Sequence, residues 1–152
     1  MDKYLTLDLN RKKDATFFAE KLFADRPEWR RKRRQKEREL ESARSLNAVS
    51  QSEVHSGNIS KPTESMAFDA MRLEDEIKKY ENYEYIVEYG LSHITQEERD
   101  VLEAFYFTKG KMMNKLVDGL AAKYSCDPRT VYRTKRTAIL NFVDAVREII
   151  NY

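Results

Sequence analysis

The chain contains very few residues that interrupt a helix. Only four glycines and three prolines occur among its 152 residues, and these residue types are the strongest breakers of regular structure. Charged residues make up 36% of the chain, which requires a large surface and suits long helices better than one compact ball. No segment has the convincing alternation of a strand. The sequence therefore predicts an all-α protein built from few, long helices.

Several classes of protein are disfavoured by the same residues. No stretch approaches the roughly twenty apolar residues of a membrane span, and the first residues lack the apolar core of a secretory signal. The single cysteine, Cys126, suits a cytoplasmic protein. His55 and His93 are too far apart to build a zinc site with it, and neither a Gly-rich phosphate loop nor a nucleophile with a histidine partner is apparent. We therefore expect a protein that does not associate with a membrane, binds no metal or cofactor and is not an enzyme.

Basic and acidic residues are separated along the chain. Residues 11–44 carry 13 Lys and Arg against 7 Asp and Glu, residues 45–100 carry 5 against 12, and residues 101–152 carry 9 against 5. The Ser- and Asn-rich stretch 47–61 is typical of a linker. These features predict four parts: an N-terminal helical basic region (1–46), the linker (47–61), an acidic connecting or dimerisation helix (62–90) and a C-terminal helical domain (91–152).

Two features of the first three parts bear on their packing. A short helix is expected over 14–23, and Pro27 is expected to open a second, arginine-rich helix, because proline is tolerated in a first helical turn. In the acidic helix, an apolar repeat of about 3.5 residues can support a coiled-coil seam, either between two copies or against the chain's own helices. Gly90 is expected to end this helix. The repeat consists of Met66, Ala70, Leu73, Ile77 and Tyr80.

The C-terminal part begins with a helix and then a helix-turn-helix pattern. Thr95 and Glu98 have the spacing of a capping box, and Val101, Leu102, Phe105 and Tyr106 are expected to be that helix's buried face. A short helix follows, with an apolar face of Leu116, Leu120, Ala121 and Tyr124. Asp127 is expected to cap the next helix and Pro128 to occupy its first position. Together these signals predict two helices joined by the tight connection 124–127.

The second of these helices separates its residues into two faces. Val131, Ala138 and Phe142 share an apolar face with Ile139 beside them, and the opposite face is basic. A basic helix after a tight turn is typical of a helix that enters the major groove of DNA, where arginine can pair with guanine. A solvated basic helix without a ligand is the alternative. The predicted DNA-binding residues are Arg129, Thr130, Tyr132, Arg133, Lys135 and Arg136.

The same segments resemble known families. Residues 94–102, 116–121 and 128–133 resemble the promoter-reading region 4 of bacterial sigma factors, and residues 130–142 are similar to the end of ArpU/RinA-like phage transcriptional regulators. The resemblance covers about residues 91–145. It implies a regulator of phage late genes in the host cytoplasm, double-stranded promoter-proximal DNA as ligand and contact with host RNA polymerase. The chain departs from the pattern by a longer link at 108–115 and by a turn without glycine.

A second basic segment leaves other functions open. Residues 26–38 hold eight Arg and Lys against two acids and can contact phosphates. Their arginines and Trp29 also resemble RNA-binding peptides of phage antitermination factors, although Trp29 is more simply explained by packing against Phe18 or Phe23. A phage DNA-packaging small terminase subunit is a further alternative, because it also joins a helix-turn-helix to helical oligomerisation segments. The expected phosphate contacts are Arg30, Arg31, Lys32, Arg33, Arg34 and Lys36.

Overall fold

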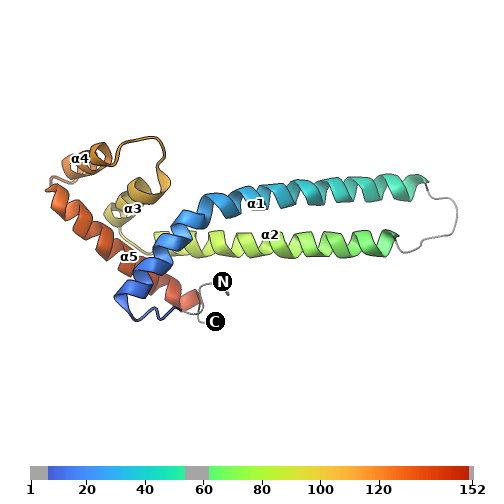
Figure 1. Ribbon diagram of the computed structural model, residues 1–152, viewed down its shortest axis with the longest axis horizontal. Helices are drawn as coiled ribbons and strands as arrows, with labels where there is room; N and C mark the ends of the chain where they lie inside the picture. The colour runs from blue at the N-terminus through green and yellow to red at the C-terminus, as the bar shows by residue number, and fades with distance from the viewer. Residues whose placement is uncertain (1–6, 54–61, 151–152) are drawn as a thin grey trace. The chain divides into compact units, whose positions relative to one another are not determined.

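The computed structural model describes residues 7–53 and 62–150 (Figure 1). These residues form helices and no strand, which confirms the predicted all-α fold. None of the described helices is both long enough and apolar enough to cross a bilayer. The elements in chain order are α1 (Lys12–Glu53), α2 (Pro62–Ser92), α3 (Gln96–Leu102), the π-helical turn η2 (Glu103–Phe107), α4 (Met113–Lys123) and α5 (Pro128–Ile150).

The chain divides into two compact units whose borders fall inside the two longest helices. One unit, here the terminal unit, combines the chain up to Arg26 with the chain from Glu84 onward. The other, here the hairpin, is Pro27–Tyr83. This division differs from the four consecutive parts expected from the sequence. The reason is that the first turns of α1 and the last turns of α2 bury their apolar residues against the C-terminal helices.

Helix α1 continues through Pro27 and does not restart there. A proline inside a helix costs about 3 kcal/mol because it removes one backbone hydrogen bond and its ring meets the preceding turn. Side chains on both sides of this position, Phe23 and Trp29 among them, are buried. The helix also includes residues 47–53, which were expected in the linker. The remaining linker residues, 54–61, lie outside the described residues.

The core of the terminal unit begins with the predicted apolar stripe of α1. Ala15, Phe18, Ala19 and Leu22 are all at most 2% exposed. The next residue, Phe23, packs against three aromatic rings, with centroid distances of 5.1 Å to Tyr106, 5.3 Å to Phe107 and 4.8 Å to Phe142. The first turns of α1 are therefore anchored on η2 and α5.

Gly90 lies inside α2, which runs on to Ser92, so the expectation that this glycine ends the helix is wrong. A Cβ atom at this position would collide with the ring of Phe142 and would lie 2.7 Å from Cγ1 of Val146. Glycine is required here because α2 and α5 approach each other closely. The residue serves packing between helices, which local sequence signals do not reveal.

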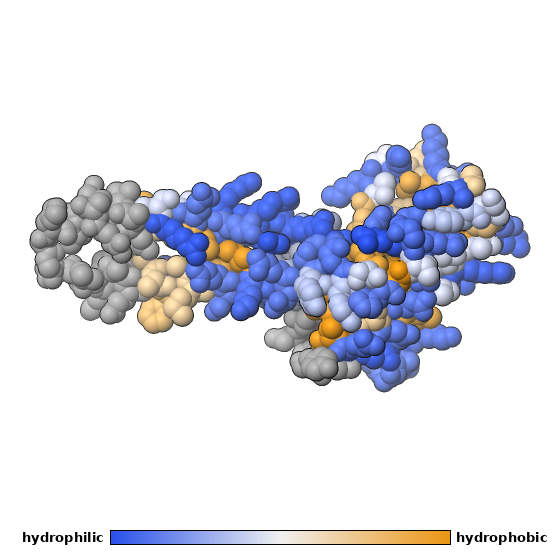
Figure 2. Space-filling model, turned by 180° about the vertical axis from the view of Figure 1, so that it is seen from behind, coloured by the Kyte–Doolittle hydropathy of each residue, from blue (hydrophilic) through white to orange (hydrophobic). Residues whose placement is uncertain are grey.

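In the hairpin, α1 and α2 run side by side in opposite directions (Figure 1). Leu40 of α1 packs with Leu73 and Ile77 of α2, and all three are buried. The apolar repeat of α2 thus contacts the chain's own first helix. Trp29 packs on Tyr83, with ring centroids 5.3 Å apart. Hydrophilic residues cover most of the hairpin on the face shown in Figure 2.

Candidate nucleic-acid interface

The connection between α4 and α5 is a compact helix ending. The N–H of Cys126 donates to the carbonyl of Ala121 (2.9 Å), and the N–H of Ser125 donates to that of Ala122 (3.3 Å). This pair of bonds defines the Schellman ending, whose left-handed position is usually glycine. Ser125 occupies that position with φ of 50°. The turn therefore keeps the geometry that glycine normally provides, although its sequence contains none.

Asp127 caps α5 as predicted. Its side-chain Oδ1 accepts a hydrogen bond from the N–H of Arg129 (2.9 Å), and its carbonyl accepts one from the N–H of Thr130 (2.8 Å). Pro128 is the first residue of the helix, where no backbone hydrogen bond is lost. The cap and the Schellman ending together set the direction in which α5 leaves α4.

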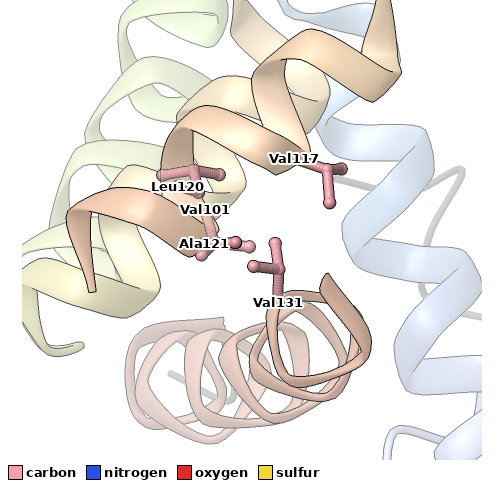
Figure 3. Close-up of a cluster of buried hydrophobic side chains, with 5 residues drawn as sticks. All are labelled: Val101, Val117, Leu120, Ala121 and Val131. Carbon is pink, nitrogen blue, oxygen red and sulfur yellow. The ribbon is translucent and has the colours of Figure 1, made fainter. Parts of the chain in front are cut away.

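A small apolar cluster holds the three helices of this region together. Val117, Leu120 and Ala121 of α4 point toward Val101 of α3 and Val131 of α5 (Figure 3). Val117 is buried, whereas Leu116, which was expected on this face, is only half-buried. The side chains of Tyr124 and Cys126 pack against the cluster from the turn. Burial of Val131 fixes which side of α5 faces inward.

The first turn of α3 is capped and also joins α3 to α5. Oγ1 of Thr95 accepts a hydrogen bond from the N–H of Glu98 (3.2 Å), which is one of the two bonds of the predicted capping box. The carboxylate of Glu98 accepts hydrogen bonds from Nδ2 of Asn141 (3.1 and 3.2 Å). Glu98 therefore links α3 to the middle of α5.

Four of the six predicted DNA-binding residues lie on the exposed face of α5. Arg129, Tyr132, Arg133 and Arg136 are exposed. The opposite face is buried, as predicted, with Ala138 and Phe142 fully enclosed and Val131 and Ile139 at 2% exposure. Because these positions repeat at i, i+3, i+4 and i+7, the four exposed side chains share one side of the helix. The structure therefore presents a basic surface with one aromatic residue, here the α5 face.

Lys135 and Thr130 differ from those four residues. Both are half-buried. Nζ of Lys135 lies 4.7 Å from the ring centroid of Phe105 and 5.5 Å from that of Tyr106, within the range of a cation–π contact. Lys135 thus ties α5 to η2. This role differs from the outward one expected from the sequence.

Aromatic side chains of η2 pack against residues of α5 within and next to the α5 face. The sequence did not predict this contact. The rings of Phe105 and Tyr132 meet edge to face at 5.5 Å. The hydroxyl of Tyr106 donates to Oε1 of Glu20 (2.8 Å), and burial together with this carboxylate raises the pKa of the tyrosine. Phe105 and Tyr106 are half-buried, in contrast to their expected place on a buried face beside Val101. The run of three aromatics at 105–107, which breaks the helical period, is the signal that could have indicated η2.

Charge around the α5 face favours an anionic ligand. The first turn of α5 contains no acidic residue, and the N-terminus of a helix carries a partial positive charge. The carboxylate of Asp127 already occupies the N-terminus of α5 as its cap, so the positive charge available to a ligand is that of Arg129, Arg133 and Arg136. Exposed arginines attract phosphate groups, because a guanidinium can bind phosphate with two parallel hydrogen bonds.

Asp100 of α3 fastens the end of α4. It accepts hydrogen bonds from Nζ of Lys123 (2.7 Å), the hydroxyl of Tyr124 and Nε2 of Gln96 (2.8 Å). The contact with Lys123 makes the largest contribution to lowering the pKa of Asp100 to about 2. The carboxylate also raises the pKa of Lys123 and of Tyr124. These contacts connect α3 to the turn that precedes α5.

The phosphate contacts predicted in the arginine-rich part of α1 fall into two groups, those that pair with acids of the chain and those that do not. Lys32 pairs with Glu28 (2.8 Å), and Arg33 pairs with Glu37 (3.0 Å). Glu81 and Glu76 of α2 also pair with Arg33 and Lys36. Arg30 takes part in an interaction within the chain. Among the six residues, only Arg31 and Arg34 are exposed without a hydrogen bond or ion pair in the described part of the chain.

Arg26, at the start of the basic run, serves the core of the terminal unit. Its guanidinium is 6% exposed and binds carboxylates of Glu84 and Glu88, each with one oxygen at 2.6 Å. It also lies 4.7 Å from the ring centroid of Phe107. This arginine is enclosed by the chain and takes no part in an exposed basic surface.

In the described ranges, no three His, Cys, Asp or Glu residues are grouped closely enough to hold a metal ion. Comparison of the chain with models of known families, with curated proteins and with solved structures finds no match. The geometry of the α5 face and its charge are therefore the basis for a functional proposal.

Proposed function

We propose that this chain is a sequence-specific DNA-binding transcription regulator that reads duplex DNA with the α5 face. The observation that carries the proposal is the separation of α5 into a buried apolar side and an exposed Arg/Tyr side, directly after a Schellman turn and an aspartate cap. A helix of this kind fits the major groove, in which each base pair displays a distinct pattern of donors and acceptors.

The exposed residues divide naturally between two kinds of contact. Arg133 and Arg136, about one and two turns into the helix, suit base edges, because a guanidinium can bind guanine with two parallel hydrogen bonds. Arg129, at the N-terminus of α5, suits the phosphate backbone. Tyr132 is 43% exposed and is held by Phe105, which limits the entropy lost when it contacts DNA.

The finer assignment rests on the sequence resemblance. Activation of phage late genes, contact with host RNA polymerase and a place in the bacterial cytoplasm are proposed on that ground, and a dimer would present two α5 faces to half-sites about one DNA turn apart.

Fluorescence anisotropy of the full chain tests the proposal, with duplexes from upstream of neighbouring genes and a scrambled duplex as competitor. We expect one duplex to be preferred and Arg133→Ala to weaken its binding by about 1–3 kcal/mol, or about 5- to 150-fold, without an equal effect on scrambled DNA. Arg72→Ala is the matched control, because Arg72 is an exposed arginine of the hairpin, 68% accessible. Equal binding of all duplexes by the unmodified chain would refute sequence-specific reading.

A further inference from the structure

The arginine-rich part of α1 has two sides with different surroundings. On the side facing α2, Nη2 of Arg33 lies 3.4 Å from Oε1 of Glu81, and Nζ of Lys36 lies 3.4 Å from Oε2 of Glu76. Farther along, Nη2 of Arg44 lies 2.7 Å from Oε1 of Glu74. The acids of α2 thus neutralise the basic residues of the inner side.

The outer side carries three arginines that these acids do not reach. Arg31, Arg34 and Arg38 are exposed and are spaced i, i+3 and i+7, so they lie in one row along the helix. In the described part of the chain, none of the three makes a hydrogen bond or an ion pair. We call this row the arginine stripe. Arg38 was not among the phosphate contacts expected from the sequence.

The acids nearest to the stripe in sequence pair with other residues. The positions four residues before and after Arg31 are Pro27 and Gln35, and the residue four after Arg38 is Ser42. Glu28 and Glu37, three residues from Arg31 and Arg34, pair instead with Lys32 and Arg33. Arg34 and Arg38 are themselves four apart, and like charges at that spacing cost about 0.2–0.5 kcal/mol. Glu41 is the first acid along this side and ends the stripe. An anionic ligand on this side would relieve the repulsion.

We propose that the arginine stripe is a second nucleic-acid contact, which binds the phosphodiester backbone of duplex DNA. Seven residues of helix span about 10 Å, and one DNA strand presents a phosphate about every 3.4 Å along the axis, so the stripe matches about three phosphates. All three positions are arginine, which binds phosphate with two parallel hydrogen bonds where lysine offers a single point charge. The inference deepens the proposed function, because it assumes that duplex DNA is the ligand.

The test compares the salt dependence of binding by the full chain and by the variant R31Q/R34Q/R38Q. Each phosphate contact contributes about 0.9 to the slope of log K against log salt concentration, so we expect the slope to fall by about 2–3. The loss of affinity should be the same for the preferred and the scrambled duplex, because backbone contacts carry no sequence information. Glutamine keeps the helix propensity, and circular dichroism checks that the variant is folded.

Two further variants control for charge and for side-chain type. R72Q/K78Q/K79Q removes three exposed basic residues of the same unit from α2, and we expect its slope to change by less than about 1. R31K/R34K/R38K keeps the charge of the stripe, and it should keep most of the slope while binding more weakly.

The measurements separate this inference from the proposed function. Discrimination between duplexes reports on the α5 face, whereas the slope reports on the stripe. An unchanged slope in R31Q/R34Q/R38Q, or a slope that falls equally in the α2 control, overturns the stripe while discrimination is unaffected. A slope that falls for a hairpin RNA but not for duplex DNA also overturns it. A slope that falls as expected in a protein without discrimination supports the stripe and refutes sequence-specific reading.

Discussion

The chain contains two basic helical surfaces, and they are built differently. In α5 the basic residues occupy one side, the opposite side is buried, and no acid lies in the first turn. In the arginine-rich part of α1 basic residues surround the helix, and acids of α2 and of α1 itself neutralise many of them. The number of basic residues in a segment therefore says little about how much charge is available to a ligand.

Arginines of the same basic segment, residues 26–38, also differ in their roles. Arg26 is buried and holds α1 to α2 through Glu84 and Glu88, whereas Arg31, five residues later, is exposed. Burial decides the difference, because a charge removed from water needs partners. An exposed arginine without partners has no such requirement and is free to meet a ligand.

The largest effect is expected from removing the buried arginine. Arg26→Ala removes a buried guanidinium that binds the carboxylates of Glu84 and Glu88, and should lower the free energy of unfolding by about 3 kcal/mol. The matched control is Arg44→Ala, also in α1, which breaks an ion pair of similar length between exposed side chains (64% and 51%). There we expect a loss below about 1 kcal/mol. Urea denaturation of both variants measures the contrast, and equal losses would contradict it.

A second experiment removes the acids of α2 that neutralise basic residues of α1. The double variant E76Q/E81Q removes the acids that face Lys36 and Arg33. Duplex DNA should bind up to about tenfold more tightly, with a slope against salt that is steeper by about 1–2. D69N/D75N changes the net charge equally at exposed positions of α2 and should have a smaller effect. If both variants bind alike, overall charge and not local neutralisation controls binding.

The contact between Asp100 and Lys123, which connects α3 to the turn before α5, can be tested by measuring stability at low pH. The pKa of Asp100 is lowered from its usual 3.8 to about 2, chiefly by Lys123. The stability that it contributes is therefore fully present above pH 3.8 and is lost as the pH falls through about 2. Because Lys123 is largely solvated, we expect Asp100→Asn to cost only about 1 kcal/mol at neutral pH. The difference from the unmodified chain should shrink on acidification below pH 3.8; a difference that stays constant would contradict the role of the charge.

The smallest effect is expected in the turn before α5. Ser125 has φ of 50°, a conformation that glycine adopts without strain. Ser125→Gly should raise the free energy of unfolding by about 0.5 kcal/mol, because relief of the strain is partly offset by the greater freedom of glycine in the unfolded chain. Ser125→Val should lower it by about 1 kcal/mol, since branched side chains fit this conformation poorly. Thermal unfolding compares the two, and a loss of stability in the glycine variant would count against the assigned geometry.

Local patterns predicted the parts of the fold that depend on neighbours in sequence. The apolar stripe from Ala15 to Leu22, the aspartate cap and the two sides of α5 follow from spacing and from the preferences of single residues, and the structure has them as expected. Helix ends were less predictable. Pro27 and Gly90 carry strong breaking signals, yet both lie inside helices, because contacts with distant segments outweigh a local preference of about 1–3 kcal/mol.

In the candidate site, too, features that depend on spacing along one helix were predictable, and contacts between helices were not. Spacing alone indicates that Arg129, Arg133 and Arg136 share a side of α5, because the period of a helix is a property of the backbone. That Lys135 lies over the rings of η2, and that acids of α2 meet Arg33 and Lys36 but leave the arginine stripe exposed, depends on which helices pack together. Residues 29 to 48 positions apart meet in these contacts. Only folding brings their charges and rings within reach, so the composition of a single segment does not contain that information.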